Sequence, residues 1–171
     1  MDGVRIVEAR PERVVELEPL YAALHEQHRA VDPQIPGVPM RDTDGAWPRR
    51  RANYEQGARE PGAFLLLAIE DGDPVGYAMV RERAASEGWA TSEICAELES
   101  IAVLPSHRGR GIGSRLLEAV HERLRERGIR ELYVEVLATN EAAERFYARH
   151  GLIRWTVTLL GRVPEPPDAP S

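Results

Sequence analysis

The chain has 171 residues, of which 43% are hydrophobic and 29% are charged, and its formal net charge is −6. This composition predicts one soluble globular domain, and the acidic balance argues against a nucleic-acid partner. The apolar run Phe64–Ile69 is too short to cross a bilayer, which argues against a membrane partner, and the single cysteine, Cys95, excludes an internal disulfide, so a cytoplasmic location is the default expectation.

The first half of the chain has the periodicities of alternating strands and helices. The predicted elements are the strand Val4–Ala9, the helix Pro11–Arg29, the loop Val31–Asp44, the helix Ala46–Gln56, and the strands Ala63–Glu70 and Pro74–Arg83. The two last strands are joined by Asp71-Gly72-Asp73, a turn sequence that predicts a hairpin.

A change in the alternation of apolar residues predicts a β-bulge in the next strand, Ile94–Val103. Apolar residues fall on even positions up to Leu98 and on odd positions from Ile101 onward. A period of two that changes phase requires one extra residue in the ladder, so we expect the bulge near Glu99-Ser100.

The second half of the chain predicts a βαβ unit followed by a helix and a last strand. The elements are the helix Ile112–Arg127, the strand Glu131–Leu137, a helix capped by Asn140 that ends near Gly151, and the strand Leu152–Leu160. The crossover helix predicts that Ile94–Val103 and Glu131–Leu137 are parallel. Four prolines in the last nine residues indicate an extended tail, so we expect a domain over residues 1–162 and a tail over residues 163–171.

The stretch Ser100–Ser114 (SIAVLPSHRGRGIGS) runs from a strand through a glycine-rich loop into a helix, which is typical of an anion-binding cradle. It lacks the Gly-Lys-Ser/Thr end of a Walker loop, and neither glycine register gives the dinucleotide fingerprint G-x-G-x-x-G. The pattern that does fit is R-x-x-G-x-G, formed by Arg108, Gly111 and Gly113.

This loop and its lead-in, Ile101–Pro105, resemble the central motif of the GNAT superfamily of acetyl-CoA-dependent N-acyltransferases, Q/R-x-x-G-x-G/A after a strand. The family's closing block, N-x-x-A-x-x-x-Y-x-x-x-G-F/L, is matched by Asn140, Ala143, Tyr147, Gly151 and Leu152. The resemblance implies an α/β (α+β) fold, with a mostly antiparallel mixed sheet, a splayed parallel central pair and flanking helices.

The resemblance also implies acetyl-CoA as the acyl-donor cosubstrate and no metal. The backbone of Ile101, Ala102 and Val103 would pair with the pantetheine arm. The residues expected around the CoA phosphates are Arg108, Gly109, Arg110, Gly111, Ile112, Gly113 and Ser114. Asn140, with Ala143 in the same block, would contact the pantetheine or the acceptor.

Three carboxylates and one phenol are the candidate catalytic groups. By resemblance, Tyr147 would protonate the departing CoA thiolate. An amine must lose its proton before it attacks, and Glu135 and Glu99 are the main candidates for the base, with Glu97 as a third. Glu135 lies in a segment that resembles the GNATs that acetylate amino termini.

The predicted reaction is direct transfer of acetyl to a primary amine, without an acyl-enzyme. A non-catalytic CoA-binding sensor domain and an accessory module that binds a partner through the proline-rich tail remain the alternatives. The acceptor, a small-molecule or peptide amine, stays open; Asp42, Asp44, Trp47 and Arg49–Arg51 lie where the family builds acceptor specificity, and family habit favours a homodimer. A metal site at His25, His28 and Asp32 is disfavoured.

Overall fold

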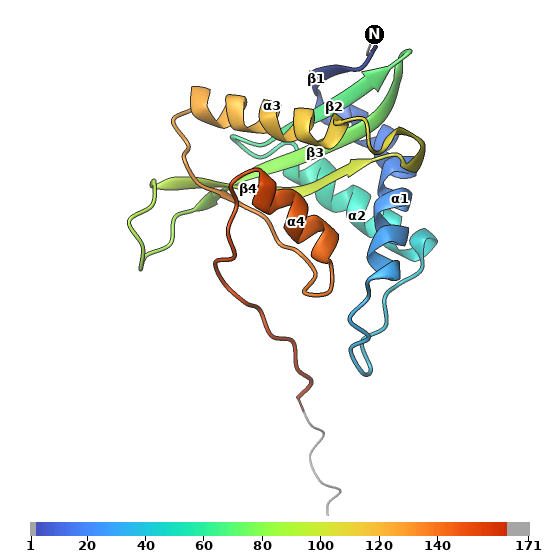
Figure 1. Ribbon diagram of the computed structural model, residues 1–171, viewed down its shortest axis with the longest axis vertical. Helices are drawn as coiled ribbons and strands as arrows, with labels where there is room; N and C mark the ends of the chain where they lie inside the picture. Colours follow the sequence, from blue (N-terminus) through green and yellow to red (C-terminus); the bar gives the residue numbers. More distant parts are fainter. Residues whose placement is uncertain (1–2, 164–171) are drawn as a thin grey trace, which may run out of the picture.

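One five-stranded sheet in the order β1-β2-β3-β4-β5 carries helices on both faces in the computed structural model, which describes residues 3–163 (Figure 1). The elements are β1 (Arg5–Ala9), the 3₁₀ helix η1 (Pro11–Leu17), α1 (Glu18–Ala30), α2 (Thr43–Gly57), β2 (Phe64–Glu70), β3 (Asp73–Ala84), β4 (Ile94–Val103), the short 3₁₀ helix η2 (Pro105–His107), α3 (Ile112–Glu126), β5 (Leu132–Tyr133) and α4 (Glu141–Arg149). Strands β1 to β4 pair antiparallel and β5 pairs parallel to β4, which confirms the predicted mixed, mostly antiparallel sheet.

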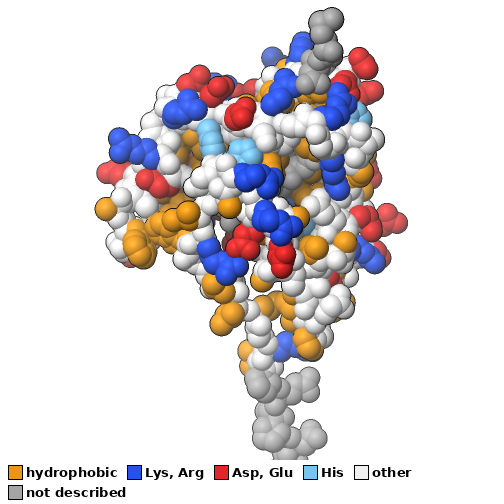
Figure 2. All heavy atoms as spheres, in the orientation of Figure 1, with side chains coloured by type: hydrophobic (Ala, Val, Ile, Leu, Met, Phe, Trp, Pro, Cys, Tyr) orange, Lys and Arg blue, Asp and Glu red, His pale blue; other side chains and the backbone are white. Residues whose placement is uncertain are grey.

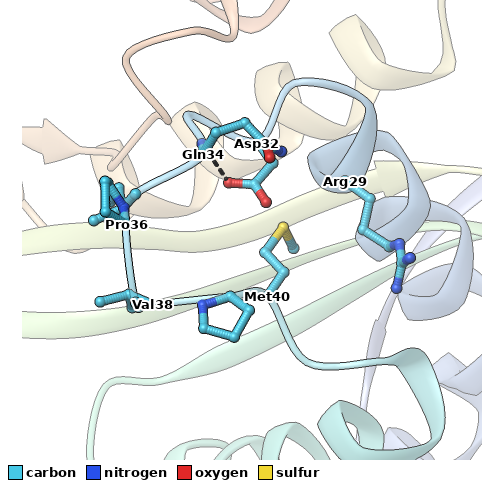
Figure 3. A pocket seen from close by; sticks show the side chains of 9 residues that line it. Arg29, Asp32, Gln34, Pro36, Val38 and Met40 are labelled. Carbon is cyan, nitrogen blue, oxygen red and sulfur yellow. Dashed lines mark hydrogen bonds between the residues drawn. The ribbon is translucent and has the colours of Figure 1, made fainter.

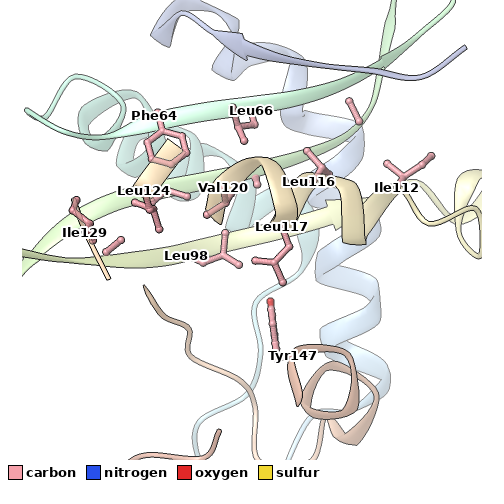
Figure 4. Packing of buried hydrophobic residues seen from close by; sticks show 14 of the residues in the cluster. Phe64, Leu66, Leu98, Ile112, Leu116, Leu117, Val120, Leu124, Ile129 and Tyr147 are labelled. Carbon is pink, nitrogen blue, oxygen red and sulfur yellow. The ribbon is translucent and has the colours of Figure 1, made fainter. Parts of the chain in front are cut away.

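The hydrophobic core has two layers, one on each face of the sheet. Successive residues of β2 point to opposite faces, so Leu66 packs in the layer under α3, whereas Leu65 and Leu67 pack in the layer under η1, α1 and α2. Figure 4 shows Leu117 and Val120 of α3 lying on the first of these faces. Because helices cover both faces, the strand is apolar throughout rather than alternating.

The predicted helix Pro11–Arg29 is divided into two helices. A 3₁₀ helix occupies Pro11–Leu17, and the α-helix begins only at Glu18. Pro19 gives the physical reason: it has no N–H, and its ring collides with the carbonyl group four residues earlier, so proline is tolerated only in the first turn of an α-helix.

The predicted bulge is confirmed. Met79 of β3 is paired with Ser100, and the next residue, Val80, is paired with Leu98, so Glu99 is the extra residue on β4. The phase change in the apolar pattern therefore predicted the position of the bulge, near Glu99-Ser100, correctly.

Strands β4 and β5 separate just before the bulge. They pair only at Ala96–Leu132 and Glu97–Tyr133, so the predicted strand Glu131–Leu137 forms a ladder over two residues. The bulge turns β4 away, and residues 134–137 leave the sheet. The parallel, splayed pair is as predicted, but it lies at the edge of the described sheet rather than in its centre.

The prediction of a last strand over Leu152–Leu160 is wrong for the described structure. Residues 152–163 belong to no strand and project away from α4 and from the body of the molecule (Figure 1). The exposed fractions of Ile153, Val157 and Leu159 are 83%, 70% and 89%, and hydrophobic side chains gather where the chain approaches the grey residues in Figure 2. Alternating apolar residues indicate that a segment is suited to a β-strand. The strand itself forms only where the edge of a sheet is available for pairing. The predicted tail lies outside the described residues from residue 164 onward.

No helix in residues 3–163 combines the length and the apolar character that crossing a membrane requires.

Candidate active site

The glycine-rich loop between η2 and α3 has the geometry of an anion cradle. Gly109 and Gly111 have φ angles of +75° and +76°, which only glycine adopts without strain. A Cβ atom at either position would meet no atom within 4 Å, so this side of the loop is open. Within the described residues, the N–H groups of residues 111–114 donate to no other group. These donors and the positive end of α3 fit a phosphate or pyrophosphate.

The two loop arginines are held by the protein itself. Arg108 Nε donates to the carbonyl oxygen of Val103 at 3.1 Å, which ties the loop to the end of β4. Arg110 Nη1 donates to Glu70 at 3.0 Å, and His107 Nε2 lies 3.0 Å from the same carboxylate. The hydrogen bond from Arg110 lowers the pKa of Glu70, so this carboxylate stays charged and holds Arg110 beside the loop.

The separation of β4 and β5 exposes one edge of β4. Past Glu97, this edge has no ladder partner within residues 3–163, while the other edge remains paired with β3 as far as Val103. The backbone of Ile101, Ala102 and Val103, the expected pantetheine contacts, is therefore at the open slot. An extended amide-bearing chain can pair with such an edge as an additional strand does.

A pocket of about 530 Å³ lies where the two strands separate. It is lined by residues of α1, α2, β4, α4 and the segment after β5, and it brings together Glu99, Glu135 and Tyr147. The three predicted catalytic residues thus share one cavity. Glu97 does not line it; its carboxylate lies 3.7 Å from Arg83 on the other side of the bulge.

Glu99 is the carboxylate that the pocket shields from water. Its side chain is 12% exposed, whereas Glu135 is exposed. Arg50 Nη1 lies 3.3 Å from Oε1 and Arg81 Nη1 lies 3.5 Å from Oε2, but Oε2 accepts no hydrogen bond within the described residues. Burial raises the pKa of Glu99, and the two arginines only partly oppose this effect.

A buried group of hydroxyls fixes the bulge. The Tyr54 hydroxyl of α2 lies 2.5 Å from Ser100 Oγ and 3.1 Å from the Tyr77 hydroxyl of β3. Both tyrosines are fully buried, and burial raises both pKa values, so the hydroxyls stay neutral. This group of hydroxyls is not among the residues predicted from the sequence. The spacing of Trp47, Arg50 and Tyr54, which places all three on one helical face, was the available signal.

Tyr147 projects from α4 toward the splayed strand. Figure 4 shows its hydroxyl directed at Leu98 of β4 and Leu117 of α3. The residue is 9% exposed, and burial raises its pKa to about 12. No hydrogen bond to this hydroxyl is formed within residues 3–163. Tyr147 is thus a protonated donor at the pocket wall at any physiological pH.

Asn140 has a confirmed structural role as the cap of α4. Its Oδ1 accepts from the Ala143 N–H at 3.1 Å, and the side chain is buried. This hydrogen bond satisfies a first-turn donor and fixes the start of the helix that carries Tyr147. The predicted contact of Asn140 with a ligand stays a prediction.

A second cavity, of about 420 Å³, lies within the loop after α1, and all of its lining residues fall between positions 29 and 40 (Figure 3). Asp32 accepts from the Gln34 N–H at 2.9 Å there, but none of the predicted catalytic or CoA-contacting residues lines the cavity. His25 and His28 line the pocket beside Tyr147 instead. In the described part of the chain no three His, Cys, Asp or Glu side chains gather as a metal site would need.

A model described as the acetyltransferase (GNAT) family matches residues 17–152. Mycothiol acetyltransferase of Thermobispora bispora is 36% identical over 103 residues, which is 60% of this chain and 34% of that protein. Phosphinothricin N-acetyltransferase of Streptomyces coelicolor is 27% identical over 154 residues, covering 88% of this chain and 84% of the relative. The chain spans about a third of the length of the mycothiol acetyltransferases that it matches.

Solved structures share the fold. Aminoglycoside N-acetyltransferase AAC(6')-Iy in complex with CoA superposes with a TM-score of 0.68 and 21% identity, over 94% of each chain. The BH1408 protein of Bacillus halodurans, as a tetramutant, superposes with a TM-score of 0.69 and 19% identity, over 93% of this chain and 99% of that one.

Proposed function

Because this chain belongs to the GNAT acetyltransferase family, we propose that it transfers the acetyl group of acetyl-CoA directly to a primary amine, without an acyl-enzyme. The observation that carries this proposal is the pocket at the splay of β4 and β5. There a largely shielded carboxylate, Glu99, and a protonated phenol, Tyr147, line one cavity at the open edge of β4.

The cosubstrate would be held by the backbone. The free N–H groups of residues 111–114 fit the CoA pyrophosphate, and the open edge of β4 fits the amides of the pantetheine arm. Acetyl-CoA would supply the electrophilic thioester carbonyl.

Glu99 is our candidate for the general base. An alkyl ammonium has a pKa of about 10.4, so the acceptor must lose a proton before it attacks. The raised pKa of Glu99 makes it a stronger base than an exposed glutamate, and its Oε2 accepts no hydrogen bond from the described residues. Glu135 lines the same pocket but is exposed, so it lacks this advantage.

Tyr147 is our candidate for the general acid. Negative charge develops on the sulfur atom as the thioester breaks, and a phenol at hydrogen-bond distance stabilises that charge. Its hydroxyl has no other partner in residues 3–163, so a donated hydrogen bond to sulfur would replace none within the protein.

The deciding experiment measures thiol release from acetyl-CoA in the presence of a broad panel of amines. The panel should include amino acids, peptide amino termini, polyamines and aminoglycosides, since the relatives are named for different acceptors. Amine-dependent release of CoA supports the proposal. Tight CoA binding without release for any amine would instead favour the sensor domain.

We also propose a homodimer in which residues 152–163 pair with a second copy. Among the described residues, 153–163 form no backbone hydrogen bonds, and their alternating apolar side chains are exposed. Each copy also has an open β5 edge, where Trp155 already lies 5.9 Å from Tyr133 between ring centres. If each copy places residues 152–163 on the β5 edge of the other, both segments gain a strand partner. The two contacts are then related by a two-fold axis, as in a symmetric dimer.

A further inference from the structure

The pocket beside Glu99 is more cationic than the chain as a whole. Its lining includes three arginines, Arg41, Arg49 and Arg50, against two carboxylates, Glu99 and Glu135, whereas the chain has a net charge of −6. Within residues 3–163, the side chains of Arg41 and Arg49 form no ion pair and no hydrogen bond. Two guanidinium groups at the pocket are therefore available to an anion.

The arginines are positioned by the protein. Arg50 lies over the rings of Tyr21 and Tyr54, at 5.9 and 5.3 Å from their centres. The backbone of Arg41 is held by His25, whose Nε2 donates to the Arg41 carbonyl oxygen at 2.8 Å. Because it is stacked in this way, the Arg50 guanidinium loses less freedom when it binds a carboxylate.

The electrostatic potential inside the pocket is positive, as the excess of arginines predicts. Burial lowers the pKa of His28, and the neighbouring His25 and Arg50 lower it further by repulsion. A polycationic acceptor would meet this repulsion at every amino group, with only two carboxylates to offset it.

A positively charged and a negatively charged side chain lie side by side in the pocket, so the pocket is complementary to a zwitterion. Arg50 and Glu99 lie 3.3 Å apart, and Oε2 of Glu99 is buried without a hydrogen bond from the described residues. An α-amino acid carries its nitrogen and its carboxylate on one carbon atom. Its ammonium group can therefore reach Glu99 while its carboxylate reaches Arg50 and Arg49.

From this arrangement we propose that the acceptor is a free α-amino acid, or an analogue with another anion on the α-carbon, rather than a polyamine, an aminoglycoside or a peptide terminus. The proposal rests on the proposed function, since it names the acceptor of the same site. The apolar part of the lining, Tyr21, Leu24 and Met40, fits an amino acid with an apolar side chain.

The first test compares amino acids with their amides in the thiol-release assay. L-phenylalanine, L-leucine and L-methionine are each measured against the corresponding amino acid amide, which lacks the negative charge and models a peptide terminus. The α-amino group of an amino acid amide is less basic than that of the acid, so more of it is unprotonated at neutral pH. Amine reactivity alone therefore favours the amides. We expect kcat/KM to be about tenfold or more higher for the acids, the range of a hydrogen bond to a charged group.

Arg49→Ala should raise KM for the acids about tenfold and leave KM for the amides unchanged. Arg51→Ala is the matched control, because Arg51 lies on the same helix, pairs with Glu55 at 2.7 Å and does not line the pocket. Equal kcat/KM for acids and amides, higher kcat/KM for an aminoglycoside, or the same effect from both arginine variants would overturn the proposal.

A binding measurement separates this proposal from the proposed function. Calorimetry on the CoA-loaded protein compares N-acetyl-L-phenylalanine with N-acetyl-L-phenylalaninamide, neither of which can react. Tighter binding of the acid than of the amide, with this difference lost in Arg49→Ala, supports an amino acid as the acceptor. This result would hold even if no amine releases thiol and the transferase proposal fails. Equal binding of the two compounds refutes it, even if the protein acetylates other amines.

Discussion

Tyr147 differs from a phenylalanine at the same place only by a hydroxyl that has no partner within the described residues. If that hydroxyl stabilises the departing thiolate, Tyr147→Phe should lower kcat about 10²-fold and leave the KM for acetyl-CoA nearly unchanged. Steady-state kinetics of thiol release measure both constants.

Tyr133→Phe is the control for this change, since it removes the same atom from a tyrosine that lies on β5 and does not line the pocket. It should leave kcat within about twofold of the original value. Unchanged kcat in Tyr147→Phe would remove Tyr147 from the mechanism.

Glu99 predicts a particular pH dependence. A base must be deprotonated to act, and burial raises the pKa of Glu99 above the ordinary value of about 4.3. As pH falls through the raised pKa, the carboxylate takes up a proton and kcat at saturating acceptor should decline. Glu99→Gln should lower kcat about 10²-fold and abolish this acid limb. Profiles of kcat against pH test the expectation.

Glu135→Gln distinguishes the two glutamates that the sequence left open. Because Glu135 is exposed, its replacement should preserve the acid limb and most of the rate. The assignment is wrong if Glu135→Gln, and not Glu99→Gln, removes the limb.

At the level of single residues, the sequence predicted which residues form the site better than it predicted their contacts and their burial. Tyr147 and Glu99 were named from a motif and from the bulge, and both line the pocket. The contact of Arg50 with Glu99 joins residues 49 positions apart, and no local pattern encodes it. For the same reason, sequence could not decide which carboxylate is buried.

Among the structural elements, the glycine loop gives the sharpest stability prediction. Gly111 has a φ angle of +76°, so Gly111→Ala should cost about 1–2 kcal/mol of unfolding free energy, the penalty of the left-handed region. Gly113→Ala is the control: its φ is not positive, and its Cβ would meet the Phe146 ring at an ordinary 3.6 Å. Urea unfolding of the ligand-free protein compares the two. Equal losses would contradict the role of backbone conformation.

Elements set by local chemistry were predictable, and elements that depend on a neighbour were not. The phase change at Glu99 and the cap at Asn140 are local, and both are confirmed. Pro19 was local as well, and its effect on the first helix was overlooked. The strand predicted over Leu152–Leu160 failed because its pairing edge is a tertiary property.

The whole molecule leaves its last described segment, residues 152–163, without a paired strand, and this predicts its oligomeric state. Burial of a large apolar side chain is worth about 1.5–3 kcal/mol, so leaving Ile153, Val157 and Leu159 in water is costly for an isolated chain. Sedimentation equilibrium should therefore give twice the chain mass. Val157→Asp combined with Leu159→Asp should produce monomers, because each charge would enter the paired, apolar face.

The opposite face of the same segment supplies the control for the dimer. Thr156 and Thr158 alternate with the apolar residues, so in a paired strand they point to the other side. Thr156→Asp combined with Thr158→Asp adds the same charge to the same segment and should leave the dimer intact. A wild-type chain that stays monomeric at all concentrations would refute the exchange. Equal disruption by both pairs would show that charge, rather than the apolar face, governs association, and would refute it as well.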